Sequence, residues 1–185
     1  MKGDTEAAAA VKSEMKRLMR GAANSYLEYA IDYASAGMYE EAAQLLSFVT
    51  EEEEAAYPMV YYAAGYFASM RNKKDEALAY YQKAEAMCPD CCFPNKLEEV
   101  LMLQDAMALN PEGAKAPYYL GNFHYAARVY EEAIACWEKS VSIDDTYPTV
   151  CATCRLPITT SGTTLKKPFP HLRRHISSMR PTPVF

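Results

Sequence analysis

The chain has 185 residues, half of them hydrophobic, which is enough for one compact domain with a buried core. Residues 1–150 carry 13 Lys and Arg against 24 Asp and Glu, a net charge of −11. This acidic charge argues against nucleic acid as a partner, because phosphate binding needs clustered cations. No apolar run approaches the ~20 residues that span a bilayer, and the first ten residues lack the apolar core of a signal peptide, so we expect a cytoplasmic protein with neither a nucleic-acid nor a membrane partner.

The first predicted element is a helix over residues 4–20. Asp4 is a suitable N-cap, an alanine run follows it, basic residues fill the last turn, and Gly21 ends the helix. We interpret residues 1–22 as an N-terminal capping helix or the remnant of a preceding repeat.

Residues 23–148 follow a recurring helix-turn-helix pattern. Paired helices are predicted over 23–36 and 39–50, over 58–70 and 74–87, and within 114–143. An unpaired helix is predicted over 95–109, in which Leu97, Val100, Leu101, Gln104 and Ala108 share one face. We therefore predict repeats at about 23–56, 58–91 and 114–147, with an extra helix segment, 93–111, that is either a repeat lacking its first helix or a spacer.

Small and large apolar residues recur at fixed positions in the three helix pairs. The third pair has Gly121, Ala133, Trp137 and Ser140; the second has Gly65, Ala77, Tyr81 and Ala84; the first has Ala30, Ala42, Leu46 and Val49. Small residues suit close helix crossings, and large apolar residues fill the gaps beside them. This frame resembles the tetratricopeptide repeat (TPR) over most of residues 23–145. The resemblance implies an all-α, right-handed helical solenoid with an irregular C-terminal tail.

A second resemblance concerns the wider context of the chain. Residues 91–150 are similar to TPR segments of large bacterial proteins, in which the repeats follow a β-rich domain thought to act on carbohydrate. This resemblance implies an alternative function, in which the chain is a truncated accessory segment of a larger carbohydrate-active enzyme.

The sequence changes character at Cys151. Residues 151–185 contain six Lys and Arg, no Asp or Glu, five prolines and no helical periodicity, so we predict that 149–185 is a disordered basic tail. Read one nucleotide out of phase, the segment that begins Cys-Ala-Thr-Cys is compatible with Trp-Arg-Asn-Leu and the first helix of a fourth repeat. We therefore hypothesise that the tail is a frameshift product, which resequencing the gene around codon 150 would test.

Several residues have the spacing of chemical sites. The Cys88–Cys91 pair has redox spacing, but it follows a helix C-terminus, where the helix dipole opposes a thiolate. Cys151 and Cys154 with His171 and His175 have the order of a zinc site, but 16 residues separate the pairs and prolines interrupt the histidine segment. We interpret both sets, and His124 in the third pair, as structural or incidental residues and expect no metal, no cofactor and no catalytic site.

The best functional candidate is the concave groove that the TPR resemblance implies. The first helix of each repeat would line this groove, and Tyr and Met side chains suit adaptable peptide recognition. The candidates are Leu27, Ile31, Met59, Tyr62, Tyr66, Met70, Lys115, Tyr118, Asn122 and Tyr125. Of the carboxylate clamp known in some TPR proteins, only Lys115 is present, so we do not expect a C-terminal acidic peptide as the ligand.

These observations predict a non-catalytic protein-interaction scaffold. It would bind a peptide or a neighbouring domain along the Tyr/Met-rich groove. Each repeat buries its apolar face only against its neighbours, so an open C-terminal repeat end near Tyr147 would also favour self-association.

Overall fold

The computed structural model describes residues 2–20, 22–50, 57–88, 92–144, 159–160 and 163–164. The helices in these ranges are α1 (Lys2–Met19), α2 (Ala23–Ser35), α3 (Tyr39–Thr50), α4 (Pro58–Met70), α5 (Lys74–Ala86), α6 (Leu97–Leu109), α7 (Lys115–Ala126) and α8 (Tyr130–Ile143). Two short strands, β1 (Thr159–Thr160) and β2 (Thr163–Thr164), pair antiparallel within the predicted tail.

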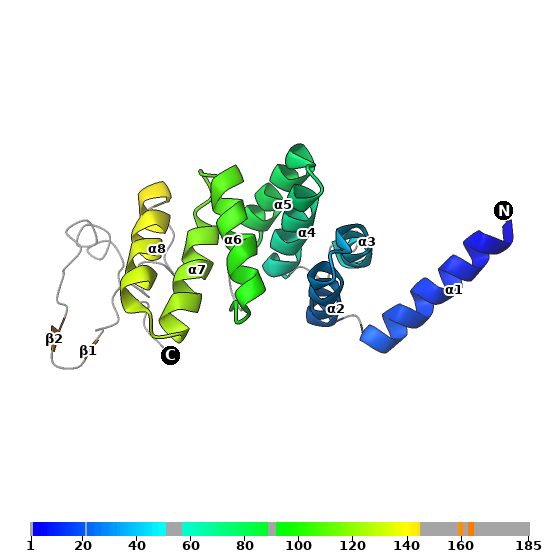
Figure 1. Ribbon diagram of the computed structural model, residues 1–185, viewed down its shortest axis with the longest axis horizontal. Coiled ribbons are helices and arrows are strands. Elements are labelled where there is room, and N and C mark those ends of the chain that lie inside the picture. The colour runs from blue at the N-terminus through cyan, green and yellow to red at the C-terminus, as the bar shows by residue number, and fades with distance from the viewer. Residues whose placement is uncertain are drawn as a thin grey trace, which may run out of the picture.

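The helices stack side by side into an elongated, all-α array (Figure 1). Helices α2 and α3, α4 and α5, and α7 and α8 pack as pairs, and α4 also contacts α2 and α3 of the preceding pair. Helix α6 has no partner of its own and packs mainly on α4 and α7. At the N-terminal end of the array, α1 extends away from the stack (Figure 1).

Local sequence accounts for several of the helix starts. Pro58 occupies the first turn of α4, where its missing N–H leaves no hydrogen bond unmade. The second helix of each pair begins with two acidic residues, which interact favourably with the positive end of the helix dipole. These acidic pairs are Glu40 and Glu41 in α3, Asp75 and Glu76 in α5, and Glu131 and Glu132 in α8.

The repeating frame lies at the crossing of each helix pair. All twelve frame residues, from Ala30 to Ser140, are buried. A Cβ atom added at Gly65 would overlap the Tyr81 ring, and one added at Gly121 would overlap the Trp137 ring. The glycines therefore allow a large aromatic residue from the second helix to lie directly on the backbone of the first. This packing confirms the TPR-like architecture predicted from the frame.

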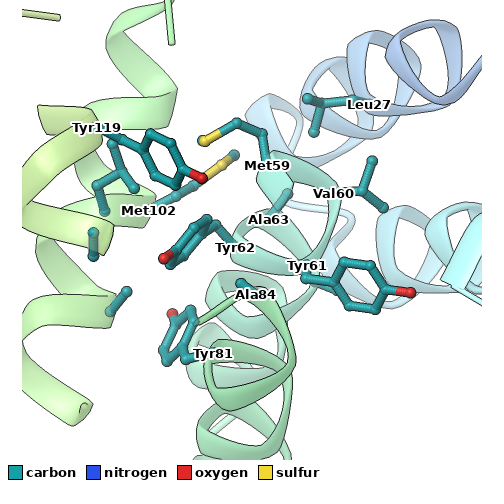
Figure 2. Close-up of a cluster of buried hydrophobic side chains, with 14 of the residues drawn as sticks. Leu27, Met59, Val60, Tyr61, Tyr62, Ala63, Tyr81, Ala84, Met102 and Tyr119 are labelled. Carbon is teal, nitrogen blue, oxygen red and sulfur yellow. The ribbon is translucent and has the colours of Figure 1, made fainter. Parts of the chain in front are cut away.

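The buried core is centred on α4. The Tyr62 ring lies 6.1 Å from that of Tyr81 in α5 and 6.0 Å from that of Tyr119 in α7, measured between ring centroids. Figure 2 shows these three rings beside Met59 and Met102, so side chains from four helices meet at one place. Aromatic pairs at such distances add to the stability gained from burial.

Two carboxylates of α6 form hydrogen bonds, one at the start of the helix and one to other helices. Glu99 is buried and accepts hydrogen bonds from the backbone N–H groups of Asn95 and Lys96, at 2.6 and 2.9 Å, which caps the start of the helix. Asp105 accepts hydrogen bonds from Tyr81 of α5, at 2.5 Å, and from Ser69 of α4, at 3.2 Å. The two bonds of Asp105 link α6 to α4 and α5.

Candidate interaction surface

Half of the ten predicted groove residues belong to the core. Leu27, Ile31, Met59, Tyr62 and Tyr118 are each at most 5% exposed. The prediction of a surface role does not fit these five side chains, because the neighbouring helices cover them. For Met59 and Tyr62 the covering helices are α6 and α7, which supply Met102 and Tyr119 (Figure 2).

Lys115 is half-buried and bonded within the chain. Its ammonium donates to the backbone carbonyls of Glu85 and Met87 at the end of α5. In return, the Glu85 carboxylate accepts hydrogen bonds from the backbone N–H groups of Lys115 and Ala116 and from the Tyr62 hydroxyl. Lys115 thus joins α5 to α7 instead of presenting a cation to a ligand.

Four predicted groove residues retain exposed surface. Asn122 is half-buried and accepts a hydrogen bond from the Trp137 ring nitrogen at 3.2 Å, and the Tyr125 ring packs at 5.6 Å from Trp137. Tyr66 is also half-buried, and Met70 at the end of α4 is 45% exposed. Of the predicted groove, therefore, Tyr66 and Met70 in α4 and Tyr125 in α7 are the apolar side chains that keep exposed surface.

The structure adds an exposed apolar strip that the groove prediction missed. We define the α6 strip as Phe93, Leu97 and Leu101, whose side chains are 67, 74 and 52% exposed. The predicted common face of α6 exists, but it is turned outward, whereas Glu99, Met102, Leu103 and Ala106 are buried. The lack of a partner helix for this segment was the signal in the sequence that could have revealed the strip.

The strip adjoins the open part of α4. Tyr66 and Met70 flank Ser69, which donates its hydrogen bond to Asp105, and Leu101 lies one helical turn before Asp105. The exposed apolar residues of the two helices therefore border the same α4–α6 contact. We call Tyr66, Met70 and the α6 strip together the α4–α6 surface.

The described thiols do not form a reactive site. Burial raises the pKa of the Cys92 thiol to about 12, and burial also raises the pKa of Cys136. Cys88 is exposed, but Cys91, with which it has redox spacing, lies outside the described residues, as do the four tail residues considered for zinc. His124 lies on α7 with its ring against Phe123, at 5.9 Å between centroids.

The described residues also bear on metal binding and on membrane insertion. No group of three or more His, Cys, Asp or Glu in this part of the chain could hold a metal ion. None of its helices has the length and apolar character needed to cross a membrane.

Comparison with known proteins gives distant structural likenesses. No family model and no curated protein sequence matches the chain. Among solved structures, one of MamA is 21% identical over 83% of this chain and 76% of that chain, with a TM-score of 0.34. YrrB, described as a TPR protein with an unusual peptide-binding site, is 19% identical over 83% of this chain and 85% of that chain, with a TM-score of 0.34. MamA from Desulfovibrio magneticus RS-1 is 18% identical over 71% of this chain and 81% of that chain, with a TM-score of 0.33.

These likenesses concern the fold alone and say nothing of what this chain binds. The helix pairs, the buried frame and the glycine–aromatic crossings are independent of them. By its own packing, the described part of the chain is an all-α, TPR-like helical solenoid.

Proposed function

We propose that the chain is a non-catalytic scaffold that binds a protein segment along the α4–α6 surface. The observation that supports this most directly is the α6 strip, in which three large apolar side chains are open to solvent on and just before a helix without a paired helix. Neighbouring exposed apolar residues of this kind commonly mark binding sites.

The spacing of the strip suits a segment with regularly placed apolar residues. Leu97 and Leu101 are four residues apart, which places them along one line of α6, and the exposed Phe93 precedes the helix. A partner helix with apolar residues three or four positions apart would match this line. Met70 extends the surface with a flexible side chain that can adapt to different partners.

Selection from a displayed library of random peptides tests this function. We expect the full chain to enrich peptides with spaced apolar residues. The double variant Leu97→Asp, Leu101→Asp should bind the enriched peptides about tenfold or more weakly, because losing each buried apolar anchor costs about 1 kcal/mol or more. Both residues are exposed, so circular dichroism should show an unchanged helix content.

A matched control uses two exposed positions on another helix. The double variant Ala135→Asp, Ser142→Asp adds the same charge to the outer side of α8 and should bind the peptides as the parent does. The proposal is wrong if no peptide is enriched, or if both double variants bind the selected peptides equally well.

Other parts of the sequence-based hypothesis stay predictions. These are the cytoplasmic location, the alternative of an accessory segment in a larger carbohydrate-active enzyme, and self-association through the open C-terminal end. Tyr147 and the rest of that end lie outside the described residues.

A further inference from the structure

We propose that the partner of the α4–α6 surface is the α1 helix of a second copy of this chain. The inference names a partner for the proposed function and rests on it. In the resulting dimer, each copy offers α1 to the α6 strip of the other.

Helix α1 is attached to its own copy along one edge only. Met15 and Met19 pack against the core, and the Lys12 ammonium lies 4.8 Å from the centre of the Phe48 ring. An open pocket of 280 Å³ remains between α1 and the α2–α3 pair. The rest of α1 points away from the stack (Figure 1), so it can contact another molecule without first leaving its own.

The free side of α1 carries a second apolar edge. Val11 and Leu18 are 60 and 65% exposed, and their separation of seven residues places them on the same side of the helix two turns apart. Their spacing along α1 is about 10 Å at 1.5 Å per residue, and that between Leu97 and Leu101 along α6 is about 6 Å. Two exposed apolar edges therefore exist on one chain, one on α1 and one at α6.

The charges beside these two edges are opposite. Residues 11–20 contain Lys12, Lys16, Arg17 and Arg20 against Glu14 alone, a net charge of +3. Helix α6 contains Glu98, Glu99 and Asp105 and no basic residue; Glu99 is buried, Asp105 accepts hydrogen bonds from Ser69 and Tyr81, and Lys96 before the helix pairs with Glu28. Glu98 is exposed and, as the residue after Leu97, lies beside the strip. An α1 helix laid on the strip would place its basic residues beside the exposed Glu98, which favours this partner over a second α6 strip.

Reciprocal pairing doubles the contact. In a dimer with two-fold symmetry, any contact from α1 of one copy to α6 of the other occurs twice. A single helix-on-helix contact falls short of the roughly 800 Å² that each partner buries in a stable interface, and two such contacts bring the dimer closer to that size. The proposal accordingly requires dimers, not open chains of molecules.

Sedimentation velocity of the full chain up to about 100 µM, a range in which weak dimers are populated, tests the proposal. We expect the fraction of dimer to rise with concentration. The double variants Val11→Asp, Leu18→Asp and Leu97→Asp, Leu101→Asp should each weaken dimerisation about tenfold or more. The α8 control Ala135→Asp, Ser142→Asp should dimerise as the parent does, which also separates this contact from association through the C-terminal end.

Mixing the two weakened variants identifies the pairing. A mixed dimer retains one unaltered contact, from α1 of the α6 variant to the α6 strip of the α1 variant, so mixing should restore association in part. A monomeric parent overturns the proposal, as does an α1 variant that dimerises normally. If the parent is monomeric but selected peptides still require Leu97 and Leu101, the proposed function stands and only the choice of α1 as partner is wrong.

Discussion

The turn inside each helix pair depends on one residue with left-handed backbone geometry. Gly37, Asn72 and Arg128 have φ angles of +81°, +59° and +63°. After each of them, the next N–H bonds back to a carbonyl five residues earlier, as in the Schellman motif: Met38 to Tyr33, Lys73 to Ala68, and Val129 to His124. Three chemically different residues therefore end the first helix of a pair in the same way.

The substitution Arg128→Gly should stabilise the protein slightly. A non-glycine residue in the left-handed region costs about 1–2 kcal/mol, and glycine loses about 0.4–1 kcal/mol through the greater freedom of the unfolded chain. The net gain is about 0.5 kcal/mol, which corresponds to a rise in melting temperature of roughly 1–2 °C for a protein of this size. Thermal unfolding followed by circular dichroism measures it.

Asn72→Gly is the matched control for this prediction. Asparagine tolerates the left-handed region better than arginine does, so its replacement should leave the melting temperature nearly unchanged. A fall in melting temperature for Arg128→Gly would show that contacts of the arginine side chain outweigh the backbone strain.

The three turns also show how far the sequence could predict single residues. Glycine marks the turn at position 37, and asparagine is a weaker signal for the same geometry at position 72. Arginine at position 128 carries no such signal, because its backbone geometry is imposed by the packing of α7 on α8. The turn at position 128 was predicted from the repeat pattern and not from the type of residue.

At the scale of the helix pair, the frame residues compensate one another in size. Glycine is paired with tyrosine at 65 and 81 and with tryptophan at 121 and 137, whereas the first pair combines Ala30 with Leu46. In all three cases 16 residues separate the two positions, and both side chains are buried. A larger residue on the first helix thus goes with a smaller one on the second.

This compensation predicts an energetic coupling between positions 65 and 81. Gly65→Ala should destabilise the fold, because overpacking costs about 1–3 kcal/mol against a gain in helix propensity of about 0.8–1 kcal/mol. Tyr81→Leu leaves a cavity and removes the hydrogen bond to Asp105. In the double variant the added methyl group occupies space that the ring has left. The loss of unfolding free energy in the double variant should therefore be at least about 1 kcal/mol smaller than the sum of the losses in the two single variants.

Urea unfolding of the parent, both single variants and the double variant measures the coupling. Gly121→Ala combined with Tyr81→Leu serves as the control, because the two positions belong to different helix pairs and their effects should add. Additive effects at 65 and 81 as well would contradict the size compensation.

At the scale of the single helix, the sequence did not predict which side of α6 is buried. The periodic positions predicted α6 and the residues on its common face, but α6 has apolar residues on two sides. The side that is buried depends on Asp105 binding Ser69 and Tyr81, which lie 36 and 24 residues earlier in the chain. Contacts with distant helices also bury Met59 and Tyr62, which are two of the five predicted groove residues that lie in the core. Local periodicity contains no information about such contacts.

At the scale of the whole molecule, the core is unusual in its phenols and thiols. Burial raises the pKa of Tyr57, Tyr62 and Tyr81 above the ordinary value of 10, and hydrogen bonds to carboxylates add to this for Tyr62 and Tyr81. Burial likewise raises the pKa of Cys92 to about 12 from an ordinary value of 9. The folded state therefore holds these protons more tightly than the unfolded state does.

This difference predicts that the protein loses stability in alkaline solution. Below pH 8 the groups are protonated in both states, and their contribution to stability is fully present. Between about pH 9 and 11 the unfolded chain releases these protons while the folded core keeps them, so the free energy of unfolding must fall as pH rises. The melting temperature should be similar at pH 7 and 8 and then drop steeply, and the part of the tyrosinate absorbance at 295 nm that comes from the buried tyrosines should rise together with the loss of helix signal. Tyr81→Phe removes one such group and should make the drop shallower. If the Tyr81 phenol, measured as the difference in absorbance between the parent and Tyr81→Phe, ionises while the helices persist, it is not held in the core as the structure has it, and the tyrosine-centred packing of α4 would be wrong.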